Sequence, residues 1–153
     1  MSHRFRFRLE QVLDHRTRRE DLVRQELAQA MAAVAVQQER AVAADDAVRA
    51  GLEAMRERMA GPVGLGALRA GHEELSFARA RAAHERAVVA QLEAVADDRR
   101  ADMVRASQDR EALCQLRRRA QERHRVEQLR LEAVVMDELA MRRAVRAGAG
   151  AAA

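Results

Sequence analysis

One short stretch, residues 61–71, interrupts a chain whose pattern is otherwise helical on both sides. It holds the only proline, Pro62, and four of the seven glycines. Proline lacks a backbone N–H group and clashes with the preceding helical turn, and each glycine costs a helix about 1 kcal/mol relative to alanine. A chain with one such break is expected to form two long helices that fold back on each other. Both chain ends then lie at the same end of the hairpin.

The composition and the spacing of apolar residues indicate how the two helices pack. Hydrophobic residues make up 48% of the chain but aromatic residues only 2%, which is typical of long helices that meet along narrow seams. Mostly apolar side chains recur at alternating spacings of four and three from Leu9 to Arg58 and from Leu75 to Leu113, as in heptad repeats. We therefore predict an all-α, antiparallel two-helix coiled-coil hairpin in a single domain, 1–153. Its predicted parts are a first helix at about 5–60, a turn at 61–71, a second helix at about 72–146 and a frayed tail at 147–153.

Two charged residues, Arg16 and Glu20, fall on the first predicted seam. Polar residues in a seam can fix the register of a coiled coil. The alternative is an ordinary solvated ion pair, which contributes little to stability. The sequence leaves both interpretations open.

The last part of the second helix has a different pattern from the seams. Apolar residues between Leu129 and Val145 cover much more than one stripe of a helix. Folding about residue 66 places the chain start near Leu131, so the second helix is predicted to overhang the first by roughly 15 residues, or about 20 Å. Such a helix has no internal partner, and a wide unpaired apolar surface usually marks a binding site.

Positive charge is concentrated at the same end of the hairpin. Residues 1–25 hold seven arginines and four acids, and residues 115–130 hold six arginines and two acids. A basic end implies an acidic or phosphate-bearing partner. One alternative is therefore a basic helical nucleic-acid-binding protein, although aromatic residues for base stacking are scarce. Another is a generic structural coiled coil that dimerises through the overhang.

The sequence lacks the residue sets that enzymes and metal sites require. A phosphate-binding loop needs a lysine beside its glycines, and the chain has none. His72 and Glu73 begin a zinc-protease pattern in which Ser76 replaces the second histidine. The single Cys114 agrees with a reducing compartment, and no apolar run suits a secretory signal or a membrane span. We expect no catalytic activity, cofactor, metal or small-molecule substrate, and a cytoplasmic location.

Two stretches of the chain resemble the FliJ family of flagellar type III export proteins. The segment from Phe5 to Ala30 is similar to the opening of that family, and the segment from Asp137 to Arg143 is similar to its closing motif. The resemblance implies an antiparallel coiled coil that acts as a non-catalytic stalk in the pore of the hexameric flagellar export ATPase. It also implies contact with the membrane export gate, escort of export chaperones, and a position at the cytoplasmic face of the inner membrane at the flagellar base. Injectisome secretion systems have similar stalk proteins.

The resemblance assigns contact with the ATPase ring to residues that match the two motifs. An alternative is that these motifs only close the coiled coil. Residues that meet the export gate are not assigned in the same way, because Ala28 to Val48 is rich in alanine and has no aromatic anchor. The predicted ring-binding residues are Phe5, Leu9, Leu13, Asp137, Glu138, Leu139, Arg142 and Arg143.

Overall fold

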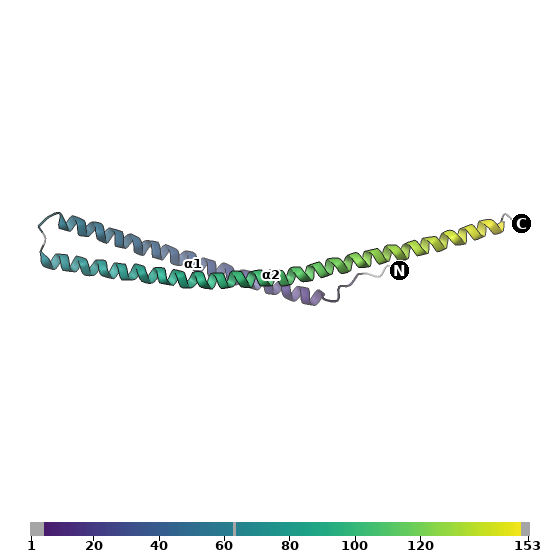
Figure 1. The fold of residues 1–153 in the computed structure, drawn as a ribbon, viewed down its shortest axis with the longest axis horizontal. Helices are drawn as coiled ribbons and strands as arrows, with labels where there is room; N and C mark the ends of the chain where they lie inside the picture. The colour runs from purple at the N-terminus through teal and green to yellow at the C-terminus, as the bar shows by residue number, and fades with distance from the viewer. Residues whose placement is uncertain (1–4, 63, 151–153) are drawn as a thin grey trace. The chain divides into compact units, whose positions relative to one another are not determined.

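The computed structural model describes residues 5–62 and 64–150, with the side chains of 5–62 and 64–145. These residues form two helices, α1 (Glu10–Met59) with 50 residues and α2 (Leu65–Gly150) with 86 residues (Figure 1). No strand occurs among the described residues. The predicted all-α class, with two long helices of which the second is longer, is confirmed.

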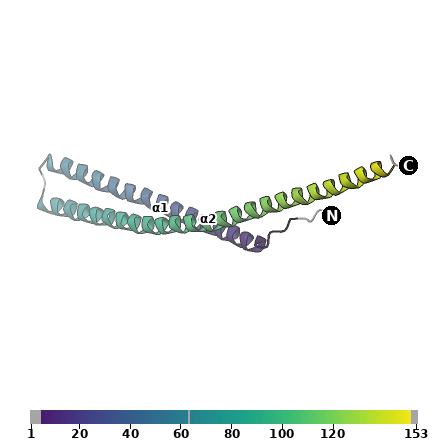
Figure 2. The ribbon, with the colours of Figure 1, turned by 45° about the vertical axis from the view of Figure 1, so that its right-hand side comes forward.

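Contacts divide the chain into two compact units, each of which contains parts of both helices. The hairpin unit consists of Arg19–Ala106. Within it, α1 and α2 run antiparallel and side by side, joined by residues 60–64 (Figures 1 and 2). The terminal unit consists of the described residues of 1–18 and 107–153. Within it, the N-terminal segment and the first turns of α1 lie against α2.

The interior of the hairpin unit is a narrow seam of small side chains. Most of its buried apolar residues are alanines, and Val23, at 1% exposed, is the largest fully buried side chain. Small residues let the helices approach closely, since a Cβ atom on Gly71 would lie 3.1 Å from the Met55 sulfur. The heptad prediction is confirmed in this unit, because its buried apolar residues fall on the predicted seams. These residues are Val23, Ala41, Ala44, Leu75, Ala82, Ala96 and Ala106.

The break between the helices is shorter than the predicted turn at 61–71. α2 begins at Leu65, and the Gly64 carbonyl accepts a hydrogen bond from the Ala67 amide at 3.0 Å. The first turns of α2 therefore include two glycines, one of them Gly71, and the second half of the turn prediction is wrong. The cost of glycine in a helix, about 1 kcal/mol, is offset by intrahelical hydrogen bonds and, at Gly71, by burial against α1.

The outer boundaries of the helices also differ from the prediction. α1 begins at Glu10 rather than near residue 5, and residues 147–150 of the predicted frayed tail belong to α2. The rest of that tail, 151–153, lies outside the described residues. Alanine is the best helix former and extends α2, whereas the alternating pattern of residues 5–8 offers no helical face to bury.

The shorter break changes which residues face each other across the seam. In the hairpin unit, a Cβ atom on Gly51 would lie 3.4 Å from Leu75. In the terminal unit, Arg16 pairs with Asp109 at 3.0 Å. The midpoint of each pair lies within one residue of position 63, whereas the Arg58–Glu74 ion pair has its midpoint at the predicted residue 66.

Candidate partner-binding surface

The N-terminal segment, residues 5–9, lies on α2 in a non-helical form that its sequence explains. Phenylalanine and arginine alternate, and the structure half-buries both phenylalanines while it exposes both arginines. The ring centroids of Phe5 and His124 are 5.6 Å apart, with the planes tilted by 38°. Alternating side chains point to opposite sides of an extended chain. The segment therefore holds to α2 through its aromatic rings and presents its arginines to solvent.

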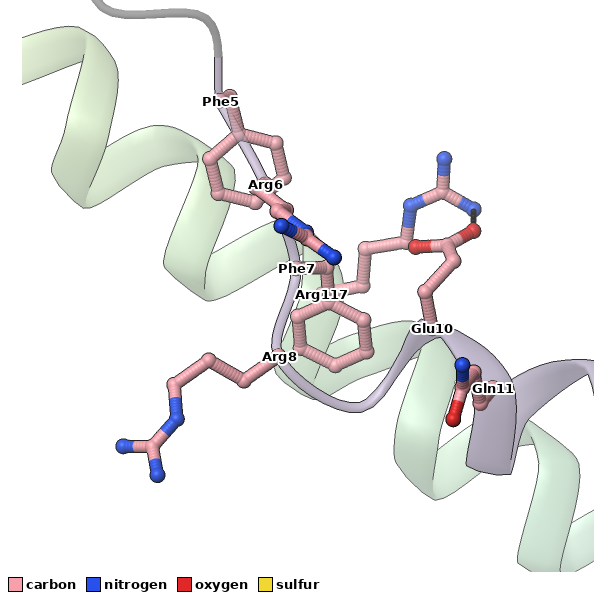
Figure 3. A pocket seen from close by; sticks show the side chains of 7 residues that line it. All are labelled: Phe5, Arg6, Phe7, Arg8, Glu10, Gln11 and Arg117. Atoms are coloured by element: carbon pink, nitrogen blue, oxygen red, sulfur yellow. Dashed lines mark ion pairs between the residues drawn. The ribbon is translucent and has the colours of Figure 1, made fainter.

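An ion pair joins the start of α1 to α2 beside this segment. Arg117 Nη1 lies 3.1 Å from Glu10 Oε1, and both side chains stay about half exposed (Figure 3). Figure 3 also shows Arg8 extending away from Arg117, so the arginines do not converge on one point. The surface forms an open, basic concavity of about 820 Å³ here. Its lining residues are Phe5, Arg6, Phe7, Arg8, Glu10, Gln11 and Arg117.

The other charges of the terminal unit are partly neutralised by ion pairs along α2. Arg125 donates hydrogen bonds to the Glu122 carboxylate, the shortest at 3.0 Å. These bonds and the positive charge of Arg125 lower the pKa of Glu122, and the same bonds and the negative charge of Glu122 raise the pKa of Arg125. Within the described part of the chain, Arg6 and Arg8 form no ion pair. The N-terminal segment thus carries positive charge that no ion pair within the described residues neutralises.

The overhang, which we define as α2 residues 129–145, is exposed along its whole length. Its large apolar residues cover about two thirds of the helix circumference, because successive residues are rotated by about 100° and Leu131, Val135 and Leu139 do not share a stripe with Leu129 and Met136. Charged residues lie between them on the same stretch. The exposed large apolar residues are Leu129, Leu131, Val134, Val135, Met136, Leu139, Met141 and Val145.

The predicted ring-binding residues fall into two separate groups. Phe5 is half-buried against α2, Leu9 is 40% exposed and Leu13 is buried at 6%. The second group lies exposed on the overhang and comprises Asp137, Glu138, Leu139, Arg142 and Arg143, with Arg142 4.0 Å from Glu138.

These two groups do not form one cluster. Phe5 faces His124, which precedes Asp137 by about 20 Å of helix at 1.5 Å per residue. The sequence placed the chain start near Leu131. The ring of Phe5 lies against His124, only a few residues nearer the start of α2 than a fold about residue 66 predicts.

Arg117 is the residue of this surface that sequence reasoning missed. It lies in a run with Arg118 and Arg119, and nothing in the spacing separates the three. Only the docking of α1 shows that Arg117 faces Glu10. Among the residues that the structure describes, no group of histidine, cysteine, aspartate and glutamate could hold a metal ion. No helix within the described ranges has an apolar run that could cross a bilayer.

Comparison with known proteins connects this surface to a family. A family profile described as flagellar FliJ protein matches residues 5–149. The match includes the N-terminal segment, both helices and the overhang. No curated protein and no solved structure matches the chain.

Proposed function

The chain belongs to the flagellar FliJ family and is thus a component of the flagellar export apparatus, in which we propose that it is a non-catalytic stalk. Its terminal unit binds inside the hexameric export ATPase, and its hairpin unit couples that ATPase to the membrane export gate. The protein then sits at the cytoplasmic face of the inner membrane at the flagellar base. Escort of export chaperones is a further proposed role. Gate coupling and escort rest on family membership alone.

The observation that supports the proposal is the distribution of apolar residues around the overhang. A helix that packs against one groove needs a single apolar stripe, whereas a helix that is apolar over most of its circumference needs surroundings that cover most of its sides. The overhang also carries charges at Arg130, Glu132 and Asp137, which require polar partner groups in any buried setting. A protein pore supplies both kinds of surface around a helix.

Within this proposal, the exposure of the predicted ring-binding residues suggests a different role for each group. Leu139 and the neighbouring Arg142 and Arg143 are exposed and free to enter the pore. Leu9 is exposed at the start of α1 and Phe5 is half-buried, so they meet the rim nearer the hairpin. Leu13 is buried at 6%, so its role is to hold α1 on α2 and present the others.

ATP hydrolysis by the cognate flagellar export ATPase tests the proposal. The full chain should raise the hydrolysis rate and promote ring formation. Leu139→Asp places a charge in the middle of the overhang and should weaken this stimulation about tenfold, the equivalent of losing roughly 1.4 kcal/mol of binding.

A matched variant separates this effect from a general loss of surface hydrophobicity. Val42→Asp makes the same change at a residue of the hairpin unit that is 57% exposed. It should stimulate the ATPase as well as the parent does. Equal stimulation by the parent and by Leu139→Asp would show that the overhang does not bind in the pore.

A further inference from the structure

A polar contact lies inside the apolar seam of the hairpin unit. Gln37 is 5% exposed, and its amide Nε2 donates a hydrogen bond to the Glu85 carboxylate and another, at 3.4 Å, to the Glu85 carbonyl. The Glu85 side chain is itself largely buried, at 18% exposed. No buried side-chain nitrogen or oxygen within the described residues lacks a hydrogen-bond partner. The Gln37 amide is therefore satisfied only while these two residues face each other, whereas Glu85 also lies 3.9 Å from Arg81 of its own helix.

The apolar part of the seam does little to fix the axial register of the two helices. Its fully buried residues near this contact are mostly alanines of one size, and half-buried valine and leucine side chains lie between them. Sliding α2 by one heptad would therefore exchange one set of apolar contacts for another. The connection has the chain length for such a slip. Residues 65–71 form two turns of α2 that include two glycines, and Leu65 at their start is 87% exposed. Unwinding them would expose the buried Gly71 and the half-buried Leu68 and no other buried or half-buried residue of the stretch.

The polar contact would not survive the same slip. Seven residues further along, Gln37 would face Leu92, and Glu85 would face Ala44. The buried amide would then lose its partner, and the carboxylate would keep only Arg81 of its own helix at 3.9 Å. That is a larger penalty than an exchange of apolar contacts. We propose that the Gln37–Glu85 contact selects the axial register of the hairpin.

The register has a consequence along both helices. Each helix runs unbroken, α1 over Glu10–Met59 and α2 over Leu65–Gly150, so the register set at Gln37 applies along both helices of the hairpin unit. Arg16 and Glu20, which the sequence placed on the first seam, have less influence on it. Arg16 is 44% exposed, and Glu20 pairs at 3.1 Å with Arg24 of its own helix, a contact that a slip leaves intact.

Distances between spin labels on the two helices test the proposal. In a Cys114→Ser background, one protein carries labels at Ala43 and Ala83, which are exposed and share the midpoint of Gly51 and Leu75. A second protein carries labels at Ala43 and Ala90, one heptad further along the same face of α2. The parent should give a single distance for each pair.

The double substitution Gln37→Leu with Glu85→Leu should add a second population to both measurements. In this second population, the distance between positions 43 and 83 lengthens and the distance between positions 43 and 90 shortens, because the helices are offset by about 10 Å along the axis. This opposite change identifies a slip. Lengthening of both distances would mean that the helices separate, which would contradict the proposal.

A matched control is available on the surface of the same unit. Gln38 donates a hydrogen bond to the Glu93 carboxylate at 3.1 Å, and this pair is exposed. Gln38→Leu with Glu93→Leu should leave single distances. If Gln37→Leu with Glu85→Leu also gives the parent's single distances, the contact does not select the register. Should circular dichroism show that the leucine variant does not fold, Gln37→Ala with Glu85→Ala takes its place, and unchanged distances there overturn the proposal equally.

Discussion

The hairpin unit buries mainly small apolar residues, whereas the overhang exposes large ones. In the hairpin unit the buried residues are mainly alanines, with Val23 as the largest fully buried side chain. In the overhang, eight leucine, valine and methionine side chains are exposed at 44% or more. Burying a large apolar side chain contributes about 1.5–3 kcal/mol, whereas alanine contributes much less. The protein thus keeps its strongest hydrophobic surface out of its own fold, which indicates that the surface serves a partner.

Removal of the overhang should give the largest effect on function and almost none on folding. Deletion of 129–153 should abolish stimulation of the export ATPase, because it removes the surface that is proposed to enter the ring. The midpoint of thermal unfolding should stay near that of the parent, because every described side chain in 129–145 is exposed. Enzyme kinetics measure the stimulation of the ATPase, and circular dichroism measures the midpoint of thermal unfolding. A variant that stimulates fully would place the binding surface elsewhere.

Truncation of single side chains should affect the stability of the fold strongly in the hairpin unit and hardly at all in the overhang. Val23→Ala should lower the free energy of unfolding by about 2 kcal/mol, because it opens space in a closely packed seam. Met136→Ala, at a position that is 66% exposed, should change it by less than about 0.5 kcal/mol. Urea denaturation, monitored through the helix content of the protein, measures the free energy of unfolding of both variants. Similar losses for the two variants would mean that the overhang packs within the free protein.

The ion pair that holds the start of α1 should contribute a smaller effect. Glu10→Gln should lower the free energy of unfolding by about 0.5 kcal/mol, since exposed ion pairs are screened by water and salt. The loss should shrink in high salt. Arg119→Gln, in the same arginine run, is the control and should have no effect. A salt-independent loss at Glu10 would point to packing rather than charge.

The smallest effect is expected at the Glu122 and Arg125 pair on the exposed surface of α2. Arg125 lowers the pKa of Glu122 in the folded protein, so the pair's stabilisation is complete above the ordinary carboxylate pKa and is lost as pH falls through the lowered value. Arg125→Gln should return the pKa of Glu122 toward its ordinary value, as measured by NMR titration of the side-chain carboxyl carbon. Arg123→Gln should leave it unchanged. If the pKa of Glu122 in the parent protein lies at its ordinary value, the Glu122–Arg125 contact does not form in solution.

Sequence pattern predicted the parts of the fold that depend on neighbours along the chain. The spacing of Leu75, Ala82 and Ala96 predicted one buried seam, and the crowding of apolar residues after Leu129 predicted an exposed overhang. These predictions were correct because the period of a helix is fixed by local geometry. The overhang residues of the candidate surface could be found in this way, whereas Arg117 could not.

The connection between the helices marks the limit of that reasoning. Glycine and proline at 61–71 determined that the chain turns once, and the sequence alone was sufficient for that. The tertiary structure decided that the turn ends at Gly64, because burial of Gly71 against α1 offsets a local penalty of about 1 kcal/mol. The pairing of residues across the seam, the contact of Phe5 with His124 and the length of α2 left for a partner were likewise decided by the tertiary structure. Each depends on contacts between residues far apart in the chain, whose energies no local pattern contains.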